Sequence, residues 1–300
     1  MKGSLENRIG ASLARDVRSE VVAYAKLLGE EARASAVLFY GSNLRTGSLD
    51  GVLDFYVLLP GPQAERIWPK VSYREWAHGG KILRAKIATM SLAKFAEAAR
   101  GESRDTTIWT RFVQPSALIW VDDSTARETV AEAIGSAAIT ASRFAAVLGP
   151  REGTPEDFWR ALFQATYRAE FRVEKPGRED SILSVNAAHF DGLLPLAWEA
   201  GDIAYGRDGA RLSPCIPDAI RNDLSTKWRR RERLGKPLNI LRLAKATTTF
   251  EGAARYGAWK LERHTGLKLE VTPFREKHPL LAMPGAAWDL FRARRRARRP

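Results

Sequence analysis

The chain has 300 residues, of which 45% are hydrophobic and 28% are charged, and this composition excludes a mainly disordered protein. The longest uncharged apolar runs fall far short of the roughly 20 residues that span a bilayer, so we expect no transmembrane segment. The N-terminal residues are charged throughout and do not resemble a secretory signal. A single cysteine, Cys215, excludes an internal disulfide framework and a cysteine-rich zinc site, which favours a cytoplasmic location.

Positive charge is concentrated at the C-terminal end. Residues 227–300 contain 20 Lys and Arg against 6 Asp and Glu, whereas the rest of the chain is nearly neutral. Two segments combine aromatic residues with arginines. The first covers residues 227–233 and contains Trp228. In the second, over 288–299, Trp288, Leu290 and Phe291 precede six arginines. Such segments are typical of interfacial helices on anionic lipid. We therefore expect an anionic membrane as partner, with nucleic-acid binding and a merely solvated tail as alternatives.

The predicted elements of the N-terminal half alternate between helices and strands. Apolar residues at helical spacing indicate the helices, and short apolar runs bounded by Gly and Pro indicate the strands. Their ranges in chain order are a helix at 11–32, strands at 36–40, 52–59 and 81–89, a helix at 92–100, a strand at 117–121 and a helix at 126–148. This order predicts an α/β fold in which helices flank a mixed sheet.

The C-terminal half is predicted to be mainly helical. Gly and Pro residues over 149–155 indicate a linker, and Thr154 followed by Pro155 is typical of a helix start, here for a helix over 155–173. Residues 182–204 continue helically, as does most of the remaining chain. The sequence therefore predicts three parts: an α/β domain at 1–150, a helical module of winged-helix type at 151–226, and a basic helical, membrane-binding region at 227–300.

A Gly-Ser turn follows the first predicted strand. That strand ends in Tyr40-Gly41-Ser42, and after eleven further residues Asp54 lies on the next strand. Glycine lets the backbone approach a triphosphate closely, and N–H groups and a hydroxyl can then donate hydrogen bonds to it. A carboxylate on the adjacent strand can hold Mg²⁺ that bridges the phosphates. The motif indicates a nucleotide site, and a hairpin loop that begins with Gly-Ser is the alternative.

This pattern resembles the signature of the nucleotidyltransferase (DNA polymerase β-like) superfamily. In particular, the chain resembles the mitochondrial translocator-maintenance phosphatidate cytidylyltransferases and their bacterial relatives over most of residues 35–190. The matching segments are Tyr40-Gly41-Ser42, Asp54-Phe55-Tyr56, Lys86 to Ser91, Arg111 with Pro115, and Tyr167 to Arg172. Tyr56 replaces the second carboxylate of the superfamily, as in the family itself. Asn43 and Gly47 depart from the family, which has Gly and Gln there.

The resemblance implies a Mg²⁺-dependent enzyme that transfers cytidylate from CTP to phosphatidic acid and releases pyrophosphate. The implied site residues are Tyr40, Gly41, Ser42 and Asn43 for the nucleotide, Asp54 for Mg²⁺, Lys86 and Arg111 for catalysis at the phosphates, and Tyr167, Glu170 and Arg172 for the substrate. Asp50, in the loop before Asp54, is our candidate for a second metal carboxylate. We expect the enzyme on the inner face of the cell membrane.

Each assignment has a structural alternative. Lys86 and Arg111 are equally compatible with solvated surface positions, and Asp50 with an ordinary loop carboxylate. Glu170 and Arg172 are close enough along one helix to contact each other instead of a substrate. For the whole chain, the alternatives are a nucleotidyltransferase that acts on RNA or protein, and a non-catalytic module that binds anionic lipid or nucleic acid.

Overall fold

A five-stranded mixed sheet forms the centre of the N-terminal half, as the sequence predicts. The computed structural model describes residues 2–170, 178–249, 252–265 and 271–274. Its strands are β1 (Ala36–Tyr40), β2 (Leu53–Leu59), β3 (Lys70–His78), β4 (Lys81–Ser91) and β5 (Ser116–Val121). Their order is β3-β4-β2-β1-β5, in which only β2 and β4 are parallel. Because β1 is antiparallel to both β2 and β5, the last residue of β1 lies beside the first residues of β2 and β5.

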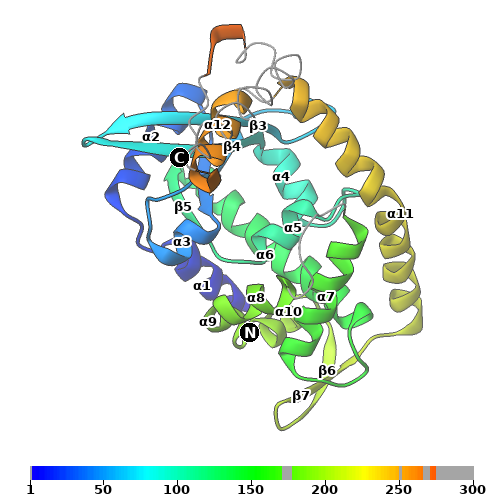
Figure 1. Cartoon of the computed structure of the whole chain (residues 1–300). Coiled ribbons are helices and arrows are strands. Elements are labelled where there is room, and N and C mark those ends of the chain that lie inside the picture. Colours follow the sequence, from blue (N-terminus) through cyan, green and yellow to red (C-terminus); the bar gives the residue numbers. More distant parts are fainter. Residues whose placement is uncertain (1, 171–177, 250–251, 266–270, 275–300) are drawn as a thin grey trace, which may run out of the picture.

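Helices cover both faces of this sheet (Figure 1). Alternate residues of a strand point to opposite faces, and here both sets are apolar. Phe39 and Phe55 face α2 (Ser19–Ala32), whereas Leu38 and Leu58 face the larger core. That core is built with α1 (Lys2–Leu13), α4 (Leu92–Ala99), α5 (Thr107–Phe112) and α6 (Ser124–Leu148). A short helix, α3 (Ser42–Thr46), follows β1.

The predicted single helix over 11–32 is wrong, because two helices share this region. α1 ends at Leu13 and α2 begins at Ser19. Leu5 and Ile9 of α1 are buried in the larger core, whereas α2 buries Tyr24 against the opposite face of the sheet. One straight helix cannot reach both faces, so the chain must turn between them. Periodicity alone does not reveal which face each segment covers.

The helical half shares a core with the first half. The expected linker joins α6 to α7 (Pro155–Ala169), and Thr154 forms the predicted cap together with Asp157. Beyond it follow α8 (Arg178–Val185), α9 (Ala187–Phe190), α10 (Leu193–Ala200), β6 (Ala204–Asp208), β7 (Arg211–Cys215), α11 (Asp218–Thr249) and α12 (Ala253–Thr265). Trp198 of α10 donates a hydrogen bond from Nε1 to the carbonyl of Ser142 in α6 at 2.9 Å. Hydrophobic packing therefore continues across residue 150.

The uninterrupted helix predicted over 182–204 is also wrong. Gly192 has φ +67°, which ends α9 and reorients the chain before α10. After Ala200 the chain forms the β6–β7 hairpin instead of continuing helically. The edge strand β3 is a further element that the sequence analysis does not predict, because charged residues interrupt its apolar alternation.

The first of the two basic segments does not face outward as predicted. Trp228 of α11 is buried, and its ring centre lies 5.6 Å from that of Phe144. Arg231 is also buried, with its guanidinium 5.0 Å from the centre of the Phe144 ring. These contacts place this face of α11 against α6, so Trp228 is a core residue and not a membrane anchor. The second segment, over 288–299, lies outside the described residues.

One helix in the described part of the chain, α6, is long and apolar enough to cross a bilayer by length and composition alone. About 61% of its apolar window is buried inside the protein. Its residues Val130, Ile134 and Phe144 belong to the main core. This burial is that of a core helix and agrees with the expectation of no transmembrane segment.

Candidate functional site

Three of the predicted residues form a row across neighbouring strands. Tyr40 of β1 pairs with Asp54 of β2, and Asp54 pairs with Lys86 of β4. Directly paired residues of a sheet point to the same face, and here it is the face that carries Tyr56 and the larger core. The row lies at the edge where β1 ends and β2 begins. Asp54 is therefore flanked by a tyrosine on one side and a lysine on the other.

Gly41 brings the turn after β1 directly beside the Asp54 carboxylate. Its backbone has φ 90° and ψ −165°, a conformation that is essentially restricted to glycine. A Cβ atom at this position would lie only 2.9 Å from Asp54 Oδ2. Gly41 and Ser42 are both exposed. The turn therefore requires glycine both for its conformation and for space, and it leaves the backbone open to a ligand at the carboxylate.

Asn43 organises the following loop and does not face a ligand with its amide. Its side chain is buried, and its Nδ2 donates hydrogen bonds of 2.9 Å to the carbonyls of Ser48 and Asp50. The predicted role of Asn43 in nucleotide binding is thus limited to its backbone. The Asp50 carbonyl accepts the second of these hydrogen bonds, and the residue is exposed.

Arg111 is clamped between two aromatic rings of the site. Its Nη1 donates a hydrogen bond of 2.9 Å to the hydroxyl of Tyr56. The guanidinium lies 5.4 Å from the ring centre of Tyr40 and 5.8 Å from that of Tyr56. Tyr56 itself is fully buried. The position where the superfamily resemblance leads one to expect a second carboxylate is therefore occupied by a tyrosine that orients Arg111. Arg111 is not a solvated surface arginine.

A cavity of about 210 Å³ opens beside the Gly-Ser turn. Its walls come from the turn, the end of α5 and α8: Tyr40, Gly41, Ser42, Arg45, Arg111, Gln114, Pro115, Ser181, Ile182, Val185 and Asn186. Pockets for whole small molecules usually measure roughly 300–1,000 Å³. This cavity therefore matches part of a ligand, and its two arginines favour an anionic group.

The charges in the row influence one another. Burial raises the pKa of Asp54, and the positive charges of Lys86 and Arg111 oppose this rise. Burial lowers the pKa of Lys86, which the carboxylate of Asp54 opposes and the charges of Arg111 and Lys260 reinforce. The Lys86 side chain nevertheless keeps access to solvent. No described residue forms an ion pair or hydrogen bond with the Asp54 carboxylate, so its oxygens are available to a ligand.

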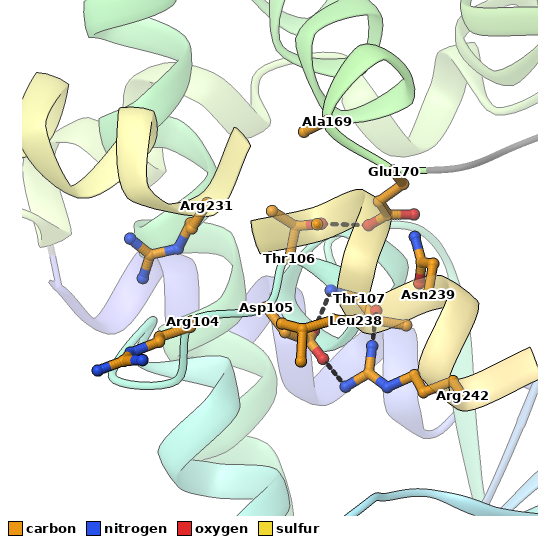
Figure 2. Close-up of a pocket in the computed structure, with 11 residues that line it drawn as sticks. Arg104, Asp105, Thr106, Thr107, Ala169, Glu170, Arg231, Leu238, Asn239 and Arg242 are labelled. Atoms are coloured by element: carbon orange, nitrogen blue, oxygen red, sulfur yellow. Dashed lines mark hydrogen bonds and ion pairs between the residues drawn. The ribbon is translucent and has the colours of Figure 1, made fainter. Parts of the chain in front are cut away.

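Tyr167 and Glu170, which are predicted to bind substrate, do not line this cavity. Glu170 is buried under α11, where it accepts a hydrogen bond from the hydroxyl of Thr106 (Figure 2). The small space around it measures about 10 Å³, which is room for one water molecule. Tyr167 packs against the core, and Arg172 lies outside the described residues. The geometry gives Glu170 a structural role.

Two further groups of cations lie near the predicted site residues, and no motif in the sequence contains them. Arg45 is exposed three residues after Ser42, and its closeness to the motif is a signal that could have revealed it. Lys260 and Arg263 come from α12, about 200 residues after the turn, and no local pattern connects them to it. Only the folded chain brings α12 onto β3 and β4 (Figure 1).

The residues present can hold Mg²⁺ only together with a ligand. The described part of the chain contains no group of three or more His, Cys, Asp or Glu that could form a metal site. Mg²⁺ is commonly bound by one or two carboxylates, with phosphate oxygens and water completing its shell. The unpaired oxygens of Asp54, beside a turn kept open by glycine, fit this mode of binding. They do not fit a metal cage made of protein alone.

No protein-family model matches the chain, and a search of curated proteins gives no sequence match.

Proposed function

We propose that the protein is a Mg²⁺-dependent nucleotidyltransferase that transfers cytidylate from CTP to phosphatidic acid. The observation that carries this proposal is the Tyr40–Asp54–Lys86 row, in which Asp54 lies against the open Gly41 turn. Tyr40 and Gly41 also line a cavity with two arginines. A mixed sheet with a Gly-Ser turn after one strand and an aspartate on the next is the arrangement expected from the superfamily resemblance. The nucleotidyltransferase fold and a winged-helix form of residues 151–226 are part of this proposal.

The reaction requires positioning and charge neutralisation more than covalent participation by the protein. A phosphate oxygen of phosphatidic acid attacks the α-phosphorus of CTP, and the bond to the β-phosphate breaks. The products are CDP-diacylglycerol and pyrophosphate. Ser42 and the Gly41 backbone would bind the triphosphate, while Arg111, oriented by Tyr56, would neutralise charge at its oxygens. Asp54 would hold Mg²⁺, which would supply positive charge at the phosphates.

A peripheral position on the inner face of the cell membrane is part of the same proposal. Its support is the composition of residues 288–299, with three apolar anchors before six arginines. A lipid substrate would give this cluster a purpose, since each basic residue near an anionic surface contributes about 1 kcal/mol.

The test is transfer of labelled cytidylate from CTP to phosphatidate in mixed micelles with Mg²⁺. Wild-type protein is expected to form labelled lipid and pyrophosphate, and Asp54→Asn to lose at least a hundredfold in rate. Asp50→Asn is a second test variant, because it removes the exposed carboxylate of the loop before β2. A similar loss with Asp50→Asn would identify Asp50 as a second metal ligand. Equal rates in wild type and Asp54→Asn would refute the proposed site.

A non-catalytic binding module is the second candidate, and one observation favours it. Asp54 is the carboxylate of the row. Two residues later, where the superfamily has a second carboxylate, the chain has Tyr56, whose hydroxyl accepts a hydrogen bond from Arg111. A protein of this kind would bind CTP but form no pyrophosphate with any acceptor. Labelling of RNA or protein in place of lipid would instead support the rival nucleotidyltransferase, and retention on RNA with a steep salt dependence would accompany it.

A further inference from the structure

Helix α12 is fixed over the hairpin formed by β3 and β4. The ring centres of Tyr256 and Tyr73 lie 5.3 Å apart, and Tyr73 is the β3 partner of Lys86. At the start of the helix, Gly252 approaches Tyr73 so closely that a Cβ atom would lie 2.3 Å from the Tyr73 carbonyl oxygen. The Arg84 guanidinium lies 5.6 Å from the ring centre of Trp259. These contacts position the helix beside the Asp54 row.

The same helix directs two cations toward this row. The Arg263 guanidinium lies 5.4 Å from the Trp259 ring centre, and its Nη1 would be 2.9 Å from a Cβ atom on Gly51. Gly51 precedes Asp54 by three residues, in the loop before β2. Lys260 is exposed, and its charge is close enough to Lys86 to affect its protonation. No carboxylate pairs with Lys260 or Arg263 among the described residues.

Asp54 therefore lies between two cationic groups. On the β1 side, Arg111 lines the cavity at the Gly41 turn. On the other side, Lys86 lies on β4, and α12 carries Lys260 and Arg263. The positive charges of Arg111 and Lys260 repel that of Lys86, so a bound anion would relieve the repulsion. In phosphoryl transfer the attacking and leaving oxygens lie roughly in line, on opposite sides of the reacting phosphorus. Two anion-binding groups that flank one metal-binding carboxylate match this requirement.

We propose that Lys86, Lys260 and Arg263 form the subsite that binds the phosphate group of the acceptor, opposite the triphosphate at the Gly41 turn. The assignment of acceptor and nucleotide to the two subsites rests on the proposed function. The binding of a phosphomonoester by the three cations does not depend on it. Three cations from two elements can surround the oxygens of a single phosphate.

The experiment separates the two subsites by direct binding to the full-length chain. Calorimetry would measure the affinity for dihexanoyl phosphatidate, a water-soluble phosphomonoester, and separately the affinity for CTP with Mg²⁺. In the double variant Lys260→Gln/Arg263→Gln, phosphatidate binding is expected to weaken at least tenfold, with CTP affinity within twofold of wild type. Inorganic phosphate should compete with phosphatidate in the wild type, because the phosphate group carries the recognition.

The matched control is Arg230→Gln/Arg233→Gln, which removes two exposed charges from α11. An equal loss of phosphatidate binding in this control would show a nonspecific charge effect and overturn the subsite. Loss of CTP affinity instead of phosphatidate affinity in the α12 variant would also overturn it. Absence of phosphatidate binding by the wild type overturns the subsite alone. Wild-type binding of both ligands without transfer of label refutes the proposed activity and leaves the subsite standing.

Discussion

Gly41 shows how a single residue makes the candidate site possible. Its backbone conformation costs other residues about 1–3 kcal/mol. The space that its missing side chain leaves is the space through which a ligand would reach Asp54 Oδ2. Arg111 contributes through the side chains around it. Two aromatic rings and one hydroxyl hold its guanidinium, whose charge would attract an anionic ligand.

Replacement of Gly41 by alanine should damage stability and binding together. We expect the free energy of unfolding to fall by about 2 kcal/mol, from backbone strain and from the clash with Asp54. CTP binding should be lost as well. The control is Gly10→Ala in α1, where no atom lies within 4 Å of the new Cβ and the helix should gain about 0.5–1 kcal/mol. Urea unfolding and calorimetry measure both effects, and an unchanged Gly41→Ala protein would contradict this account of the turn.

His189 makes stability depend on pH. Burial, together with the nearby charges of Arg8 and Arg15, lowers its pKa to about 4, although a 2.8 Å hydrogen bond to the carbonyl of Val113 opposes the shift. The unfolded chain therefore binds a proton that the folded chain does not, from the ordinary histidine pKa near 6.5 down to about 4. Stability should fall as pH decreases through this window, by about 2 kcal/mol between pH 8 and pH 5.

The variant His189→Gln isolates this contribution. Glutamine can still donate to the Val113 carbonyl but does not titrate, so its unfolding free energy should decline less between pH 8 and pH 5. Urea unfolding of both proteins at several pH values measures the difference. Parallel decline in wild type and variant would assign the pH dependence to other groups.

At the scale of the element, α11 is held to the rest of the protein by charged side chains. Arg242 forms an ion pair with Asp105 and donates a 3.2 Å hydrogen bond to the hydroxyl of Thr107 (Figure 2). It also lies over the ring of Trp68. Arg231 donates to the carbonyls of Gly101 and Ser103. These contacts fix the loop before α5, and α5 carries Arg111. Through this chain of contacts α11 supports the element that carries Arg111.

Loss of the Asp105 carboxylate should therefore be costly. Asp105 is buried, so Asp105→Ala leaves Arg242 without its partner and also removes an acceptor for the backbone N–H of Thr107. We expect a loss of about 2–3 kcal/mol in the free energy of unfolding. Asp223→Ala, which breaks an exposed pair with Lys227 on the same helix, should change it by less than about 0.5 kcal/mol. Equal effects of the two variants would show that the Asp105 contacts do not stabilise α11.

At the scale of the whole molecule, one core joins segments that the sequence separates. Phe158 and Trp198 from the second half pack against each other at 5.1 Å and belong to the core that includes Leu38 and Leu58 of the sheet. Removal of the second half would expose this apolar surface, at roughly 25 cal/mol for each Å². The boundary at residue 150 is a connection between helices, and the packing shows no division there.

A fragment of residues 1–150 should therefore not fold alone. We expect it to lack a cooperative thermal transition and to bind a hydrophobic dye, whereas the full chain should unfold in one transition by both tryptophan fluorescence and circular dichroism. Differential scanning calorimetry of both proteins is the measurement. A cooperative transition in the fragment would show that the α/β half is an independent domain.

The sequence by itself determined the mixed α/β class, most strand positions and the closeness of the Gly41 turn to Asp54. These features depend on local apolar runs and on short spacing along the chain. Only the tertiary structure decided that Lys86 stands beside Asp54, that Tyr56 orients Arg111, and that Glu170 and Trp228 are buried. It also decided the contribution of α12, since contacts between residues about 200 positions apart depend on packing and leave no periodic signal in the chain. The break between α1 and α2 has the same cause, because the two helices bury their apolar sides on opposite faces of one sheet.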